Sequence, residues 1–220
     1  MPFAGAGGSF FREWDHLSDD VEVLPVSLPG RERRIDQAPY RNVQRAVNGL
    51  LPDLLAEVDR DRPVAVFGHS LGAVLAFEIV RRLVDYTDLP VSRLLVSGSP
   101  GPTTRREVRA TGLPDDEFLR QVGRFAGFTD EAMTFDGVRD MVLPTLRADV
   151  EMHENYRPSS RDPLPVPITS LRGRSDELVD TGQAREWERE TTAGFTLVEP
   201  EGGHMYLVDR PEDVVRAVGS

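Results

Sequence analysis

A serine lies at the centre of the pentapeptide Gly68-His69-Ser70-Leu71-Gly72, which has the G-x-S-x-G pattern. In that pattern the serine occupies a sharp turn between a strand and a helix, which exposes its hydroxyl to a substrate. An apolar run precedes the motif and a helical pattern follows it, and the helix N-terminus favours developing negative charge. We therefore predict Ser70 as a nucleophile; the alternative is a glycine-lined turn with an incidental serine.

A serine nucleophile needs a base, and the base needs an acid to orient it, in the chain order Ser, Asp or Glu, His. The chain has only four histidines. His16 precedes the serine, His69 is its direct neighbour and should point elsewhere, and His153 lies in a helical segment. His204 follows the last predicted strand within the tight loop Glu201-Gly202-Gly203-His204-Met205, so we predict it as the base.

The orienting acid is expected in the loop after the penultimate predicted strand. That loop reads Arg172-Gly173-Arg174-Ser175-Asp176-Glu177. Asp176 is our first choice, and Glu177 is the alternative because the two acidic residues are adjacent.

Acyl transfer also needs N–H donors for the oxyanion that forms on the substrate carbonyl. One donor is the N–H of Leu71, directly after the nucleophile. The second is expected from the Gly-rich loop at residues 2–9, where the N–H of Ala4 or Gly5 is the candidate. This loop lacks the Lys-Ser/Thr ending of a P-loop and the G-x-G-x-x-G spacing, which disfavours phosphate binding.

The segments around these residues alternate between apolar, β-rich runs and helical patterns, which is typical of a parallel sheet with crossover helices. The predicted strands lie at 21–28, 64–67, 93–97, 166–171 and 195–199. The predicted helices lie at 41–58, 71–84, 183–191 and 211–218. The predicted fold class is α/β, with a mostly parallel central sheet flanked by helices.

The alternation is interrupted between about residues 112 and 163. Helical segments are predicted there at 115–125, 135–142 and 145–156, with no strand between them. We interpret this insertion as a lid over the active site of a single domain that spans residues 1–220. The alternative is a helical excursion that covers the edge of the sheet.

The composition excludes several other classes of protein. The net charge of −11 argues against a general nucleic-acid binder. No apolar run approaches the ~18 residues of a membrane span, and the first residues lack the pattern of a secretory signal, so we expect a cytoplasmic protein. The absence of cysteine removes thiol nucleophiles and zinc–cysteine sites, and the histidines are too far apart for a familiar metal site. We predict neither a metal nor a cofactor.

Distinctive segments run through nearly the whole chain: Pro2–Gly5, Phe11–Trp14, Leu28–Arg34, Leu113–Glu117, Leu143–Asp149, Gly173–Asp176 and Gly202–Leu207. Together with the G-x-S-x-G motif they resemble the type II (external, editing) thioesterases of polyketide and nonribosomal peptide biosynthesis, within the α/β-hydrolase superfamily. The Leu-Pro-Gly-Arg and Leu-Arg-Ala-Asp stretches are far more specific than G-x-S-x-G.

The resemblance implies a mobile helical lid and hydrolysis of acyl groups from the phosphopantetheine arm of an acyl or peptidyl carrier protein. We expect a monomer that needs no cofactor of its own, because the carrier protein supplies the arm. Carrier proteins are usually acidic, so a local basic patch is needed for binding. The candidates for that patch are Arg31, Arg33, Arg34, Arg105, Arg106 and Arg109.

Two other functions remain open at this point: a carboxylesterase or acyl-CoA hydrolase of the same fold, and a non-catalytic carrier-binding protein. The resemblance also raises a question about the N-terminus. Members of the family have a central strand directly before the Gly-rich loop, whereas the loop here begins at residue 2. We expect that the natural protein begins upstream, with that strand.

Overall fold

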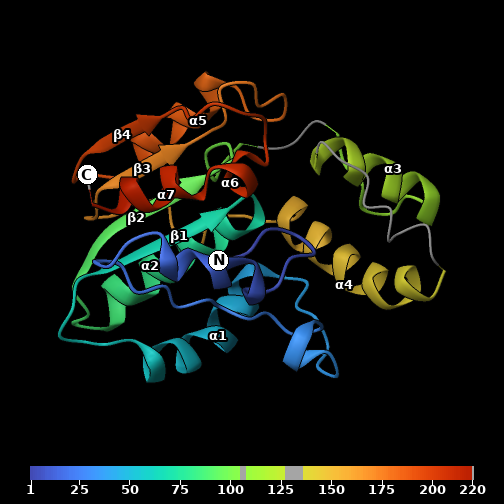
Figure 1. The fold of residues 1–220 in the computed structure, drawn as a ribbon, viewed down its shortest axis with the longest axis horizontal. Coiled ribbons are helices and arrows are strands. Elements are labelled where there is room, and N and C mark those ends of the chain that lie inside the picture. Colours follow the sequence, from blue (N-terminus) through green and yellow to red (C-terminus); the bar gives the residue numbers. More distant parts are fainter. Residues whose placement is uncertain (105–107, 127–135, 220) are drawn as a thin grey trace.

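The computed structural model describes residues 1–104, 108–126 and 136–219 (Figure 1). Four parallel strands form a sheet in which each strand pairs with the next one in the chain. They are β1 (Val64–His69), β2 (Val91–Ser97), β3 (Ile168–Leu171) and β4 (Phe195–Val198). Because the strands are parallel, the loops that follow them gather at one edge of the sheet. The predicted α/β class is confirmed.

Helices cover both faces of this sheet. The helices α1 (Val43–Glu57) and α2 (Leu71–Tyr86) pack on one face, and Val66, Leu94 and Val96 of the strands belong to the same buried cluster. The other face carries η1 (Gly8–His16), α6 (Tyr206–Asp209) and α7 (Pro211–Val218), which pack with Phe67 and Leu95. Neighbouring strand residues thus point to opposite faces and are covered on both.

The remaining short elements connect these layers. They are η2 (Glu32–Arg34), α5 (Thr181–Arg185) and η4 (Glu186–Glu190). The helix predicted at 183–191 is therefore a short α-helix continued by a 3-10 helix. Its first turn is fixed by a capping box between Asp180 and Gln183, and its buried Trp187 donates a hydrogen bond to the Ser99 carbonyl at 2.9 Å.

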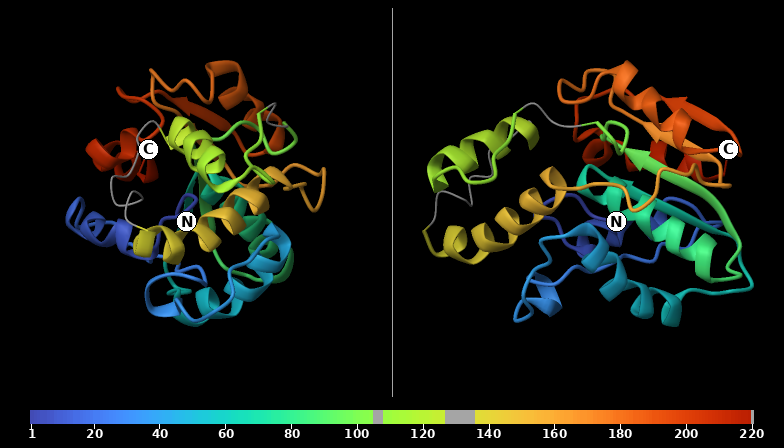
Figure 2. Two further views of the ribbon diagram at one scale, coloured as in Figure 1. Left: turned by 90° about the vertical axis from the view of Figure 1, so that its right-hand side faces the viewer. Right: turned by 180° about the vertical axis from the view of Figure 1, so that it is seen from behind.

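The helices α3 (Asp115–Ala126) and α4 (Asp136–Glu154) follow β2 and lie to one side of the sheet, as Figures 1 and 2 show. The prediction of two helices at 135–142 and 145–156 is wrong, because α4 continues through Pro144; residue 135 lies outside the described residues. An interior proline disfavours a helix by about 3 kcal/mol. Here the flanking Leu143 and Leu146 are buried against Phe118 of α3, which favours continuation.

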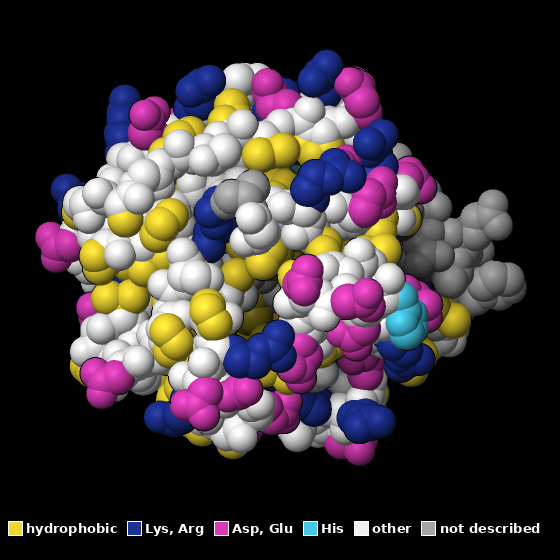
Figure 3. Space-filling model, turned by 60° about the vertical axis from the view of Figure 1, so that its left-hand side comes forward, with side chains coloured by type: hydrophobic (Ala, Val, Ile, Leu, Met, Phe, Trp, Pro, Cys, Tyr) yellow, Lys and Arg dark blue, Asp and Glu magenta, His cyan; other side chains and the backbone are white. Residues whose placement is uncertain are grey.

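The strand predicted at 21–28 is also wrong, since the described structure contains no strand there. A groove of about 440 Å³ separates Val21–Val26 from β1, so this segment has no strand beside it with which to pair. Met1 lies against β1, with its amino group 2.6 Å from the Phe67 carbonyl and its own carbonyl 3.4 Å from the His69 nitrogen. Figure 3 shows this side of the molecule, where hydrophobic side chains surround a hollow.

Within the described ranges, the structure contains no helix that is long and apolar enough to cross a membrane.

Candidate active site

Ser70 occupies a strained turn between β1 and α2. Its φ of 53° and ψ of −113° lie outside the regions that side-chain-bearing residues prefer, and such strain collects at functional sites. The flanking glycines make the turn possible: a Cβ on Gly68 would lie 1.9 Å from the Gly72 carbonyl oxygen. Although Ser70 stands at the N-cap of α2, its hydroxyl makes no capping hydrogen bond to the helix. The hydroxyl is therefore left for other chemistry.

The loops that carry Asp176 and His204 are joined by backbone hydrogen bonds. Arg174 donates its N–H to the Pro200 carbonyl at 2.7 Å, and Ser175 donates to the Gly202 carbonyl at 2.9 Å. The loops approach so closely that a Cβ on Gly173 would lie 2.1 Å from the Gly203 carbonyl oxygen.

These loops bring a carboxylate and an imidazole together. Asp176 Oδ2 lies 2.9 Å from His204 Nδ1, and both side chains are buried. With the proton on Nδ1 directed to the carboxylate, the lone pair of Nε2 is available to accept another proton. Glu177, the alternative acid, is exposed.

The environment of Asp176 keeps it ionised. Burial alone would raise the pKa of this carboxyl, but the hydrogen bond and charge of His204 outweigh it, and the pKa lies below its usual value. The N–H groups of Leu178 and Val179 add to this effect, since they donate to Oδ1 at 2.8 and 3.2 Å.

His204 also lies beside the turn that carries Ser70. Its ring centroid is 4.9 Å from that of His69, the residue before the serine. A Cβ on Gly98 would be 2.9 Å from His204 Cε1, and the preceding residue, Ser97, accepts the Ser70 N–H at 2.8 Å. The structure thus gathers the three predicted residues at one edge of the sheet. Their catalytic roles stay predictions.

Next to these residues lies a second pair of a serine and a histidine, Ser97 and His69, of which Ser97 was not predicted from the sequence. His69 Nδ1 is 2.9 Å from Ser97 Oγ, which is in turn 2.9 Å from the Tyr206 hydroxyl. Ser97 is fully buried at the end of β2, so its hydroxyl faces protein groups. The available signals were its position at the end of a buried strand and the presence of Tyr206 in the His204 motif. We interpret this network as support for the His204 loop.

The structure narrows the choice of oxyanion donor in the Gly-rich loop. The Gly5 N–H is already used, because it donates to Asp149 Oδ2 at 2.8 Å. Within the described part of the chain, the Ala4 N–H has no hydrogen-bond acceptor. The loop is held against α2, where a Cβ on Gly72 would lie 2.3 Å from the Met1 carbonyl oxygen. Ala4 and Leu71, the first residue of α2, remain the predicted donors.

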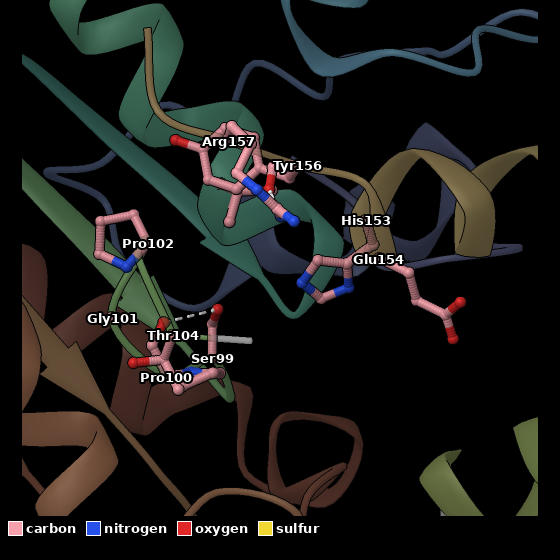
Figure 4. A pocket seen from close by; sticks show the side chains of 10 residues that line it. Ser99, Pro100, Gly101, Pro102, Thr104, His153, Glu154, Tyr156 and Arg157 are labelled. Carbon is pink, nitrogen blue, oxygen red and sulfur yellow. Dashed lines mark hydrogen bonds between the residues drawn. The ribbon is translucent and has the colours of Figure 1, made fainter. Parts of the chain in front are cut away.

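A small cavity lies between the end of α4 and the loop that follows β2. Figure 4 shows His153 and Arg157 on one side of it and the Ser99–Thr104 segment on the other. Val74, one helical turn after Ser70, also lines it. Its volume of about 30 Å³ suits water rather than an acyl chain.

The predicted basic patch is corrected at one position. Arg31 is buried and forms an ion pair with Asp149, so it cannot bind a partner protein. Arg33 is exposed, and Arg109 contacts Glu154 and Asn155. Arg105 and Arg106 lie outside the described residues.

The chain is similar to known thioesterases in both sequence and structure. The model of the Thioesterase domain family matches residues 1–220. Thioesterase PikA5 of Streptomyces venezuelae is 33% identical over 220 residues, covering 97% of this chain and 76% of that protein. The structure of the type II thioesterase BorB, from the borrelidin biosynthetic cluster, matches with a TM-score of 0.87 and 34% identity, covering 99% of this chain and 89% of that one. YbtT, a type II thioesterase from the Yersiniabactin NRPS/PKS pathway, matches with a TM-score of 0.85 and 28% identity, covering 99% and 88%.

Proposed function

Because the chain belongs to the thioesterase domain family, we propose that it is a type II editing thioesterase of polyketide or nonribosomal peptide biosynthesis. Its substrates are aberrant or stalled acyl groups on the phosphopantetheine arm of acyl or peptidyl carrier proteins. BorB and YbtT, which are both type II thioesterases, match 99% of the chain, and this match supports the proposal.

In the first half of the reaction, Ser70 attacks the thioester carbonyl. His204 Nε2 takes the proton from the hydroxyl as the oxygen–carbon bond forms, and Asp176 stabilises the resulting imidazolium. The N–H groups of Leu71 and Ala4 stabilise the oxyanion, each worth about 10²–10³ in rate when well placed. The carbon–sulfur bond then breaks, and His204 returns its proton to the departing pantetheine sulfur.

In the second half, water replaces the thiol. His204 takes a proton from the water as its oxygen attacks the acyl-Ser70 ester, and it then gives that proton to Ser70. The net reaction consumes one water and yields a carboxylic acid and a free carrier thiol. Ser70 and His204 are regenerated.

The observation that carries this proposal is the pairing of the strained Ser70 turn with the Asp176–His204 contact of 2.9 Å. A nucleophile needs an oriented base, and these residues occur in the chain order that this arrangement requires. The carrier protein as partner follows from the relatives, and the monomeric state and cytoplasmic location stay predictions.

We further propose that α3 and α4 form a lid within a single domain. The cavity between α4 and the Ser99–Thr104 segment is too small for an acyl chain, so a substrate entering there must displace one side or the other. Long-chain and short-chain acyl groups should then differ in their rate of hydrolysis.

The direct test is intact-protein mass spectrometry of an acyl-carrier protein incubated with the enzyme. We expect loss of the acyl mass with the wild-type chain and its retention with Ser70→Ala. The acyl-CoA and the simple ester with the same acyl group are measured beside it. Faster turnover of either one would favour an acyl-CoA hydrolase or a carboxylesterase, and binding without turnover of any substrate would indicate a carrier-binding protein.

A further inference from the structure

The Leu28–Arg34 and Leu143–Asp149 segments were the most distinctive in the sequence, and the reaction steps above assign neither of them a part. Arg31 of the first segment and Asp149 of the second are 118 residues apart in the sequence, yet their side chains are in contact in the structure. Arg31 Nη1 lies 2.7 Å from Asp149 Oδ2, and Nη2 lies 2.8 Å from Oδ1. The pair is bidentate, and both side chains are buried.

The same two residues also bind the Gly-rich loop. Asp149 Oδ2 accepts the Gly5 N–H at 2.8 Å, and Arg31 Nη1 donates to the Ala6 carbonyl at 2.9 Å. Gly5 has a φ of +80°, and a Cβ there would lie 3.1 Å from Leu146 of α4. Gly5 and Ala6, the two loop residues that follow Ala4, are therefore held by side chains of two distant segments.

The next residue along, Glu32, fixes the other end of the loop. Its carboxylate accepts the N–H groups of Gly8 and Ser9 at 3.1 and 2.9 Å. Glu32 has a φ of 50°, which is strained for a residue with a side chain. Thr145 of α4 donates its hydroxyl to the Gly30 carbonyl at 2.9 Å, which joins this turn to α4 as well.

We propose that Arg31 and Asp149 are positioning residues for the oxyanion hole. Asp149, held by Arg31, accepts the Gly5 N–H and so fixes the peptide between Ala4 and Gly5. The backbone of Ala4 is thereby oriented so that its own N–H is directed at the developing oxyanion. The inference rests on the proposed function, since it assigns the Ala4 N–H to the oxyanion. Because Asp149 belongs to α4, the pair also ties the proposed lid to the catalytic loop.

The test uses variants that leave no unpaired charge in the interior. Arg31→Met/Asp149→Leu removes both charges and the acceptor for the Gly5 N–H. Arg31→Met/Asp149→Asn also removes both charges but keeps an oxygen that can accept that N–H. Glu151→Gln is the matched control, because Glu151 lies on the same helix and pairs with Arg41 instead of the loop.

Each protein is assayed with an acyl-N-acetylcysteamine thioester and with a trifluoromethyl ketone carrying the same acyl chain. For the Leu variant we expect kcat to fall about 10²-fold with KM within about threefold. Affinity for the ketone, whose serine adduct carries an oxyanion, should fall in proportion to kcat. The Asn variant should recover most of both losses, and Glu151→Gln should match the wild type.

If the ion pair were purely structural, its removal would lower the melting temperature but would leave kcat and ketone affinity unchanged. A folded Leu variant with wild-type kcat and ketone affinity would therefore overturn the inference. If neither double variant folds, the inference is tested with Arg31→Lys, because lysine keeps the charge but loses the bidentate geometry. Wild-type kcat and wild-type ketone affinity in that variant would also overturn the inference. A wild-type enzyme that hydrolyses no thioester would instead overturn the proposed function.

Discussion

The two sides of the Ser70 turn are held in place in different ways. On one side, Asp176 and His204 sit on loops that follow paired strands and are linked by backbone hydrogen bonds. On the other side, the Gly-rich loop carrying Ala4 follows no strand of the described sheet and is held by Arg31 and Asp149. Backbone pairing thus positions His204 and Asp176, the proposed base and acid, whereas long-range side-chain contacts hold the loop that carries Ala4, the proposed oxyanion donor.

The largest expected effect comes from removing the nucleophile. Ser70→Ala should lower kcat for thioester hydrolysis by about 10⁴-fold or more, leaving only the contribution of binding and the oxyanion hole. Steady-state kinetics with an acyl-carrier protein measures this effect. The matched control is Ser97→Ala, whose hydroxyl contacts His69 and Tyr206 in the interior. It should lower the melting temperature while kcat stays within about tenfold; a reversed ranking would exclude Ser70 as the nucleophile.

The assignment of Asp176 as the acid that orients His204 can be tested by replacing its carboxylate. Asp176→Asn keeps the shape of the side chain but no longer holds His204 in the tautomer that accepts the serine proton, so kcat should fall by about 10⁴-fold. Glu177→Gln removes the neighbouring exposed carboxylate and should leave kcat unchanged. Equal losses in the two variants would contradict the assignment of Asp176.

The position of the Gly-rich loop can be tested at Gly72, where the loop contacts α2. A Cβ on Gly72 would lie 2.3 Å from the Met1 carbonyl oxygen, so Gly72→Ala must push the Gly-rich loop away from Ser70. A displacement of this size is expected to lower kcat about 10²-fold. In the control Gly137→Ala, the new Cβ has no atom within 4 Å and lies in α4. It should leave kcat unchanged and add about 0.5–1 kcal/mol to the free energy of unfolding. Unchanged kcat in Gly72→Ala would show that the loop tolerates displacement.

The smallest expected effect is on stability in acid. Since the pKa of Asp176 lies below the ordinary value of 3.8, the unfolded chain takes up this proton first as the pH falls. The stabilisation from Asp176 is therefore complete above about pH 4 and is lost as the pH falls through its lowered pKa. Urea unfolding from about pH 6 to pH 3 should show a steeper loss of stability for the wild type than for Asp176→Asn. Parallel curves for the two proteins would contradict the lowered pKa.

The arrangement of Ser70, Asp176 and His204 was largely predictable from the sequence, and the contacts that hold the Gly-rich loop were not. Ser70 and His204 lie in short motifs at the ends of apolar strands, where local patterns determine the geometry. Arg31 was predicted as a surface residue because one arginine in a turn gives no sign of a carboxylate 118 residues away. The apolar pattern of 21–28 predicted a strand, but a strand also needs a neighbour with which to pair. Pro144 suggested a break that packing against α3 prevents.

The role of Ser70 as the nucleophile is tested most directly by locating the covalent acyl intermediate. The wild-type protein is mixed with excess acyl-N-acetylcysteamine thioester, quenched in acid and digested, and the acylated peptide is mapped by mass spectrometry. We expect a single acyl adduct on Ser70, absent from Ser70→Ala and still present in Ser97→Ala. Adduct on Ser97, or turnover with no serine adduct at all, would contradict it.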